Sequence, residues 1–256
     1  MPQAARFQLH HGNAFQLLPS LENESIDALI ADPPYCSGGL FASDRTRDPV
    51  AKYEQSAVKI SRATFDGDQK DQRSWTSWTS WCSAWLRECY RVLKPGAAFA
   101  VFVDWRQLPA LTDAVQMADF IWRGIAVWDK TERTRPALGR PRNQAEYIVW
   151  GSKGAMPGRK GTPVLPGVHR EPVLQRDKHH LTGKPVGVMQ WLCGLCPPGS
   201  VILDPFAGSG STGVAALLTE RRFVGIERDQ HYHQVAAKRL AAAASGVVLT
   251  ARETAG

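Results

Sequence analysis

Residues 200–227 read SVILDPFAGSGSTGVAALLTERRFVGIE and determine the predicted fold. An apolar strand from Ser200 to Leu203 leads into a glycine-rich segment, a helix that continues through Val214–Leu218, and a second strand from Phe223 to Ile226. Glu227 follows the second strand directly. A strand, a glycine-rich loop, a helix, a strand and an acid in this order are typical of a mononucleotide-binding unit of an α/β fold.

The residue types in this unit suit a nucleoside. Glycines let the main chain approach a ligand closely, and a helix N-terminus offers N–H groups to an anion. Glu227 can accept both hydroxyls of a ribose. Gly208, Gly210 and Gly213 also fit the GxGxxG pattern of nicotinamide dehydrogenases, but Pro205-Phe206-Ala207 separates the strand's acid from the first glycine. A nicotinamide-dependent oxidoreductase is therefore only an alternative.

The motif Asp32-Pro33-Pro34-Tyr35 is the second chemical feature, and it follows the apolar run Ile26–Ala31. The run predicts a buried parallel strand, so the motif lies at the carboxyl end of a strand, where open α/β sheets bind ligands. Prolines lack an N–H group, and we expect their carbonyls to accept hydrogen bonds from a ligand. A carboxylate, free carbonyls and a ring suit a planar ligand with an amino group. A proline-stiffened turn with a capping Asp and a packed Tyr is the alternative.

Strands and helices alternate along the rest of the chain, which predicts a sheet covered by helices on both faces. Further strands are expected at Phe7–His11, Ala97–Val103, Ile121–Trp128 and Glu146–Trp150, and helices at Ala14–Leu18, from Ser74, around Leu108–Ala118, from about Lys184 to Cys196 and at Asp229–Ala244. The strand at 146–150 is a candidate hairpin partner of the strand at 121–128. The helix from Ser74 carries tryptophans at three- and four-residue steps, which predicts core packing rather than a platform for bases.

The chain has 256 residues and a formal net charge of +7, which favours a polyanionic partner. Residues 130–184 carry twelve Lys or Arg and four Asp or Glu, so the positive charge belongs to this segment. Because residues 151–183 are also rich in Gly and Pro and lack a helical period, the segment is predicted to follow a phosphate backbone; a flexible linker is the alternative. The candidate DNA-binding residues are Arg133, Arg135, Arg140, Arg142, Arg159, Lys160, Arg170 and Arg176.

The cysteines and the apolar runs indicate the compartment. Five scattered cysteines favour reduced thiols and a cytoplasmic protein. We expect no membrane partner, because no apolar run approaches the length of a span and Met1–Gly12 lacks a signal-peptide core. Cys193 and Cys196 form a single CxxC without a second pair, and no metal site is predicted.

The two motifs together resemble those of the amino-methyltransferases of DNA. Asp32-Pro-Pro-Tyr35 is similar to their catalytic motif, and Asp204–Thr212 is similar to their S-adenosylmethionine loop. A catalytic motif first, a basic recognition segment next and a cofactor loop last resembles the β class of that family. The resemblance extends from about Phe7 to Leu240.

The resemblance implies a Rossmann-like, S-adenosylmethionine-dependent methyltransferase fold with a mostly parallel, seven-stranded sheet and permuted motif order. It also implies three parts: a catalytic half at 1–130, a basic target-recognition region at 131–183, and a cofactor-binding half at 184–256. The cofactor residues implied are Asp204, Phe206, Ala207, Gly208, Ser209, Gly210, Ser211, Glu227, Thr182, Lys184 and Asn13. Lys184 would meet the methionine carboxylate. Asn13 stands where the family usually has an Asp near the adenine, and a turn residue is its alternative role.

The implied reaction is methyl transfer to the amino group of a base that has left the duplex. Asp32 and the Pro33 carbonyl would accept the amine hydrogens and Tyr35 would stack on the base, so catalysis rests mainly on alignment. Asp32 favours N6-adenine, because N4-cytosine enzymes of this class more often carry Ser at this position. N4-cytosine methylation is the alternative, and a protein or RNA methyltransferase or an inactive DNA-binding protein is less favoured.

Double-stranded DNA is the expected partner. The family often forms homodimers and occurs in restriction–modification systems, but the sequence shows no interface signature and does not reveal a restriction partner.

Overall fold

The computed structural model describes residues 6–35, 75–136, 138–156, 158, 164–173 and 183–254. The strands are β1 (Phe7–His11), β2 (Ile26–Ala31), β3 (Leu93–Val103), β4 (Ile121–Asp129), β5 (Ala145–Ser152), β6 (Val168–Arg170), β7 (Val201–Asp204) and β8 (Arg222–Glu227). The helices are α1 (Ala14–Leu17), the 3-10 helix η1 (Leu18–Ser20), α4 (Trp75–Val92), α5 (Leu108–Met117), α6 (Val186–Cys193), α7 (Ser211–Leu218), α8 (Gln230–Ala244) and α9 (Ala251–Thr254).

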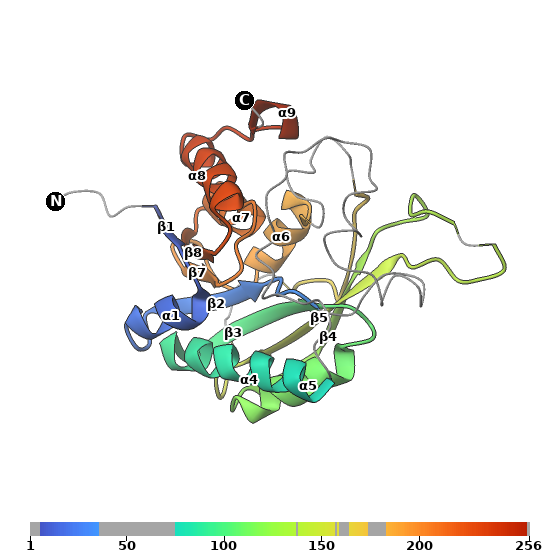
Figure 1. Ribbon diagram of the computed structural model, residues 1–256, viewed down its shortest axis with the longest axis horizontal. Coiled ribbons are helices and arrows are strands. Elements are labelled where there is room, and N and C mark those ends of the chain that lie inside the picture. The colour runs from blue at the N-terminus through green and yellow to red at the C-terminus, as the bar shows by residue number, and fades with distance from the viewer. Residues whose placement is uncertain are drawn as a thin grey trace.

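In the described part of the chain the strands form one eight-stranded sheet in the order β1-β8-β7-β2-β3-β5-β4-β6. Only β5 runs antiparallel to its neighbours, β3 and β4, so the sheet is mostly parallel as predicted. The hairpin predicted between the strands at 121–128 and 146–150 is confirmed by the pairing of β4 with β5. Helices α4 and α5 cover one face of the sheet, and α6, α7 and α8 cover the other (Figure 1).

The expected number of strands, seven, is one too few, because β6 pairs in parallel with β4 at the edge of the sheet. Main-chain bonds from Val127 N to Gly167 O and from Glu171 N to Asp129 O, 2.9 and 3.0 Å, extend this pairing. A three-residue strand is too short to produce a periodic pattern in the sequence, and the segment around it had been predicted to be irregular.

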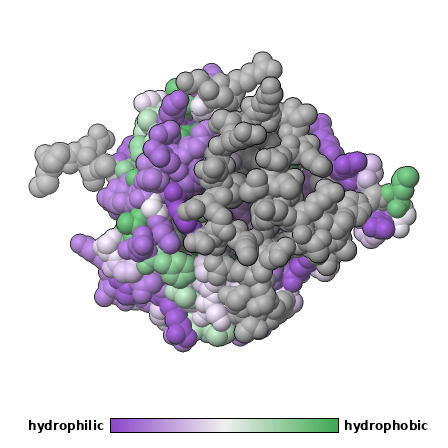
Figure 2. Space-filling model, in the orientation of Figure 1, coloured by the Kyte–Doolittle hydropathy of each residue, from purple (hydrophilic) through white to green (hydrophobic). Residues whose placement is uncertain are grey.

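The tryptophan-bearing helix packs into the core as predicted. Trp78 and Trp85 of α4 are fully buried in the cluster between α4, α5 and the sheet. The opposite cluster contains the apolar side chains of α6 and α7. On the face shown in Figure 2, the coloured surface is mostly hydrophilic, and its apolar parts are small and separate. Among the described helices, none is both long and apolar enough to cross a membrane.

The arrangement of the strands brings the two motifs together. β2 and β7 are parallel neighbours, with Leu29 beside Leu203. Since both strands run in the same direction, Asp32 after β2 and Asp204 at the end of β7 emerge at one edge of the sheet. Residues more than 170 positions apart thereby line a common site at the carboxyl edge.

Candidate active site

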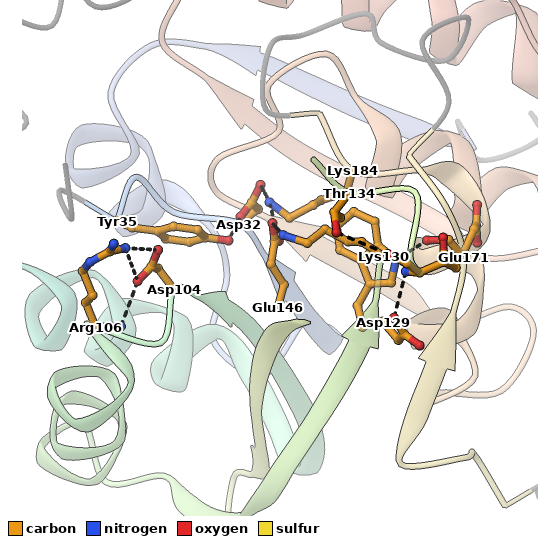
Figure 3. Close-up of polar contacts among 12 residues, drawn as sticks. Asp32, Tyr35, Asp104, Arg106, Asp129, Lys130, Thr134, Glu146, Glu171 and Lys184 are labelled. Atoms are coloured by element: carbon orange, nitrogen blue, oxygen red, sulfur yellow. Dashed lines mark hydrogen bonds and ion pairs between the residues drawn. The ribbon is translucent and has the colours of Figure 1, made fainter. Parts of the chain in front are cut away.

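Asp32 is held from both sides by hydrogen-bond donors (Figure 3). The Tyr35 hydroxyl donates to Asp32 Oδ1 at 2.6 Å, and the Lys184 ammonium donates to Oδ2 at 2.6 Å. Tyr35 thus contacts Asp32 across the two prolines, only three positions along the chain. The carboxylate is thus fixed in position before any ligand binds.

A row of alternating charges continues from Asp32 into the protein. Lys184 Nζ lies 3.3 Å from Glu146 Oε2, and Lys130 Nζ lies 3.4 Å from Glu146 Oε1. The Lys184 side chain is only 5% exposed, so its charge depends on these carboxylates rather than on water. Two ammonium groups and two carboxylates leave the row electrically balanced.

Burial and charge set the protonation states in this row. Burial raises the pKa of Asp32, and the nearby Lys184 charge opposes the rise. Burial would lower the pKa of Lys184, but the charges of Asp32 and Glu146 outweigh it and raise that pKa. For Glu146, the two lysines outweigh burial and lower its pKa. Burial, followed by the charge of Asp32, raises the pKa of Tyr35, so its hydroxyl keeps the proton that it donates.

The two proline carbonyls differ, which corrects the expectation that both face a ligand. The Pro34 carbonyl accepts a hydrogen bond from Trp78 Nε1 at 3.0 Å, so α4 anchors the motif from the core. The Pro33 carbonyl accepts no hydrogen bond from the described residues. Pro33 is therefore the one of the two that fits the predicted contact with a ligand amine.

Two acids, Asp204 and Glu227, accept hydrogen bonds from the glycine-rich loop and the start of α7. Asp204 Oδ2 accepts from the Thr212 hydroxyl at 2.6 Å, and Oδ1 accepts from Phe206 N at 2.9 Å. Glu227 accepts from Gly208 N and from Asp229 N, each at 2.7 Å. Burial raises the pKa of Asp204 to about 7.

Glycine is required at specific points of this loop. Gly210 has φ +83° and forms the N-cap of α7, and a Cβ at this position would lie 3.1 Å from Ala236 Cβ. Gly208 has φ +52°, with only the Phe206 carbonyl within 4.0 Å of a Cβ built on it. Helix α7 begins at Ser211, directly after Gly210, and includes the predicted helical run Val214–Leu218.

Arg239 of α8 supports the loop from behind and was not predicted. It is 2% exposed, and its Nη1 donates to the Ser209 carbonyl at 2.6 Å and lies within 3.3 Å of the Ser209 and Ser211 hydroxyls. The available signal was its position, since Arg239 lies four residues after Val235 on the face of α8 that is buried.

Four further residues predicted to bind the cofactor have contacts with other groups of the protein. Phe206 packs edge-on against Trp85, with ring centroids 5.0 Å apart. Ala207 is buried, and its N–H donates to the Ile226 carbonyl at 2.9 Å. The Asn13 side chain caps α1 by accepting from Phe15 N at 3.0 Å, which is the turn role given as its alternative. Lys184 pairs with Asp32 and Glu146, whereas the resemblance implied a contact with the methionine carboxylate.

Helix α6 begins at Val186 with Pro185 as its N-cap and without a capping side chain. Thr182, predicted to bind the cofactor and to cap this helix, lies outside the described residues.

Four of the predicted DNA-binding residues lie exposed on the connection between β4 and β5: Arg133, Arg135, Arg140 and Arg142. Arg142 Nη1 also donates to the Thr134 carbonyl at 2.7 Å. Arg170 of β6 forms ion pairs with Asp129, at 3.3 Å, and with Glu132. Arg159, Lys160 and Arg176 lie outside the described residues.

Glu146 was predicted within a strand but not as a site residue. The signal was the predicted hairpin, because an antiparallel strand begins at the edge where its parallel neighbours end. Cys193 and Cys196 are buried, and burial raises the pKa of the Cys193 thiol to about 12. Across the described ranges, no group of three or more His, Cys, Asp or Glu is arranged to hold a metal ion.

Comparisons with known proteins identify the family of the chain. The family model described as DNA methylase, of the N6/N4 group, matches residues 26–238. The chain is 32% identical to the putative methylase YubD of Escherichia coli K12 over 240 residues, covering 90% of this chain and 88% of that protein.

Two solved structures share the fold. M1.HpyAVI, in its complex with SAM, is 23% identical, with a TM-score of 0.61, covering 91% of this chain and 100% of that one. The cytosine-N4-specific PvuII DNA methyltransferase is 15% identical, with a TM-score of 0.69, and the match covers 91% of this chain and 86% of that one. With the family match over most of its length, the chain belongs to the N6/N4 DNA methylase family and is a DNA amino-methyltransferase.

Proposed function

We propose that this enzyme transfers a methyl group to the N6 amine of adenine in double-stranded DNA. The observation that carries the proposal is Asp32, a carboxylate fixed at the carboxyl edge of the sheet by Tyr35 and Lys184. The choice of adenine rests on the Asp at this position, where N4-cytosine enzymes resembling this chain more often carry Ser.

The methyl donor is S-adenosylmethionine, which when bound supplies an electrophilic methyl group on a sulfonium. The residues present fit this group. Gly208 and Gly210 have left-handed backbone conformations, and the side of Gly208 on which a Cβ would project is open. Glu227, held at the loop by Gly208 N, provides a carboxylate for the ribose hydroxyls, and α7 provides N–H groups for the methionine carboxylate.

The catalytic residues act on the amine of the target base. That base must leave the duplex, and its amine is a poor nucleophile because its lone pair is delocalised into the ring. Asp32 and the Pro33 carbonyl accept the two amine hydrogens, and the Tyr35 ring stacks on the base. Because burial raises the pKa of Asp32, its carboxylate is a better acceptor for the proton that the amine loses.

DNA is bound, in this proposal, by the basic region at 131–183, between the catalytic half at 1–130 and the cofactor half at 184–256. The exposed arginines of the β4–β5 connection, such as Arg133 and Arg140, contact phosphates. The homodimer that the resemblance implies remains a prediction.

The test is transfer of labelled methyl from S-adenosylmethionine to unmethylated genomic DNA, followed by nucleoside analysis. Label in N6-methyladenine, lost in Asp32→Ala while cofactor binding persists, is the expected result. Label in N4-methylcytosine would overturn the choice of base and keep the site. Cofactor binding without labelled DNA would direct attention to a protein or RNA substrate.

A further inference from the structure

A tryptophan at the edge of the active site has no role in the reaction described so far. β3 ends at Val103, and Asp104-Trp105-Arg106 follows at the carboxyl edge of the sheet. Trp105 is 54% exposed, whereas Trp78, Trp85 and Trp128 are buried. A single exposed apolar side chain is common on protein surfaces, so its surroundings decide whether it has a function.

The indole of Trp105 is held in place by an arginine. The Arg106 guanidinium carbon lies 4.6 Å from the centroid of the Trp105 ring, within range of a cation–π interaction. Arg106 is fixed in turn, because its Nη1 lies 3.0 and 3.2 Å from the two oxygens of Asp104 and its N–H donates to Asp104 Oδ1 at 2.8 Å. These contacts support the indole while leaving about half of the side chain exposed.

This group lies next to the catalytic motif and farther out toward solvent. Ala31 pairs with Val101 across β2 and β3, so Asp32 is level with Phe102, and Asp104 lies two residues, roughly 7 Å, beyond it. Figure 3 shows Asp104 and Arg106 on the same side of the site as the Tyr35 ring. The Asp104 charge also contributes to the raised pKa of Tyr35, although less than burial, Asp32 and Glu146.

We propose that Trp105 stacks on a nucleobase of the bound DNA, next to the base that enters the site at Tyr35. This inference rests on the proposed function. A nucleobase fits the indole, since it is flat, offers a π face and belongs to the DNA whose phosphates the arginines of the β4–β5 connection are proposed to contact. Because the Arg106–Asp104 pair already orders the ring, little side-chain freedom is lost on stacking.

The test compares Trp105→Ala with Trp122→Ala in full-length protein. Trp122 is 41% exposed but lies near the start of β4, at the opposite edge of the sheet, which makes it a matched control. We expect about tenfold weaker binding of duplex DNA for Trp105→Ala, near-normal binding for Trp105→Phe, and no change for Trp122→Ala. Affinity for S-adenosylmethionine and the circular dichroism spectrum should stay as in the wild type.

Salt dependence separates stacking from charge. The slope of log Kd against log salt concentration should be unchanged in Trp105→Ala, because no phosphate contact is removed. Normal DNA affinity in Trp105→Ala, or a clearly reduced salt slope, would overturn the inference. Methyl transfer by the wild type is measured on the same DNA: if it is present, those results reject only the stacking role, and if it is absent, the proposed function itself fails.

Discussion

The Lys184 ammonium lies 2.6 Å from Oδ2 of Asp32, although 152 positions separate the two residues in the chain. Lys184 is nearly inaccessible to water, and its second carboxylate neighbour is Glu146. A cation in this position opposes the rise in the pKa of Asp32 that burial causes. Lys184, a residue from the other half of the chain, therefore favours the anionic form of Asp32 and orients its carboxylate.

Lys184→Met is expected to lower methyl transfer at neutral pH by at least about tenfold. Without the cation the pKa of Asp32 rises further, so a larger fraction of the enzyme holds a protonated Asp32 that cannot accept the amine hydrogen. The acid limb of the kcat profile should move to higher pH, while affinity for S-adenosylmethionine stays within a few-fold. The measurement is kcat at saturating substrates between about pH 5 and 9.

The matched variant is Lys184→Met combined with Glu146→Gln, which removes one cation and one anion together. It should regain stability and shift the acid limb part of the way back, since the two residues interact directly. An acid limb that stays in place in both variants would contradict the role of Lys184. A buried ion pair with one partner removed costs about 3–5 kcal/mol of stability, so thermal midpoints are recorded alongside.

Local features of the site could be predicted from the sequence. The run before Asp32 and the unit from Val201 to Glu227 each contain their own strand, turn and chemistry within a short stretch, so their positions follow from pattern alone. Neighbouring strands at one carboxyl edge then imply a shared site.

The contacts across the sheet could not be predicted in the same way. The row from Asp32 through Lys184 to Glu146 exists because β5 also pairs antiparallel with β3, a neighbour that the predicted hairpin with β4 does not specify. Likewise, Arg239 meets Ser209 only through the packing of α8 on the loop. Propensity and periodicity describe segments, whereas these contacts depend on how segments are ordered in the sheet.

Gly210→Asp is expected to abolish binding of S-adenosylmethionine at concentrations that saturate the wild type, and to leave DNA binding within a few-fold. The new side chain would meet Ala236 at 3.1 Å in a left-handed backbone conformation and bring a negative charge to the start of α7. Isothermal titration with the cofactor measures the effect.

Gly246→Asp is the control, because Gly246 has φ +80° but no atoms within 4 Å of a built Cβ. This variant also places a side chain on a residue with positive φ, but no neighbouring atoms crowd it, so it should bind the cofactor normally. Equal affinity in the two variants would show that Gly210 is not part of the cofactor loop.

Arg133→Ala and Arg140→Ala should each weaken duplex binding and reduce the slope of log Kd against log salt concentration by about one. Both residues are exposed on the β4–β5 connection. Arg170→Ala should change the slope less, because Asp129 and Glu132 already pair with its guanidinium. Fluorescence anisotropy over a range of salt concentrations measures all three, and equal slopes in the wild type and the Arg133 and Arg140 variants would exclude phosphate contacts there.

Asp204 should make the free energy of unfolding depend on pH in an unusual direction for a carboxyl group. Burial raises its pKa from 3.8 to about 7, so between about pH 4 and pH 7 the folded protein holds a proton at Asp204 that the unfolded chain has lost. The stabilisation is fully present below the unfolded pKa and is lost as pH rises through the folded pKa, with a slope of at most about 1.4 kcal/mol per pH unit.

Asp204→Asn removes this titration and keeps the size of the side chain. The difference in unfolding free energy between the wild type and this variant, from urea titrations between about pH 4 and 7, should therefore move in favour of the variant as pH increases. The comparison subtracts the part of the Asp32 and Glu227 titrations that is independent of Asp204; burial raises the pKa values of both residues, and their charges also help to raise the pKa of Asp204. A difference that stays constant over this range would mean that Asp204 is ionised in the folded protein, and that its bonds with Thr212 and Phe206 N outweigh the effect of burial.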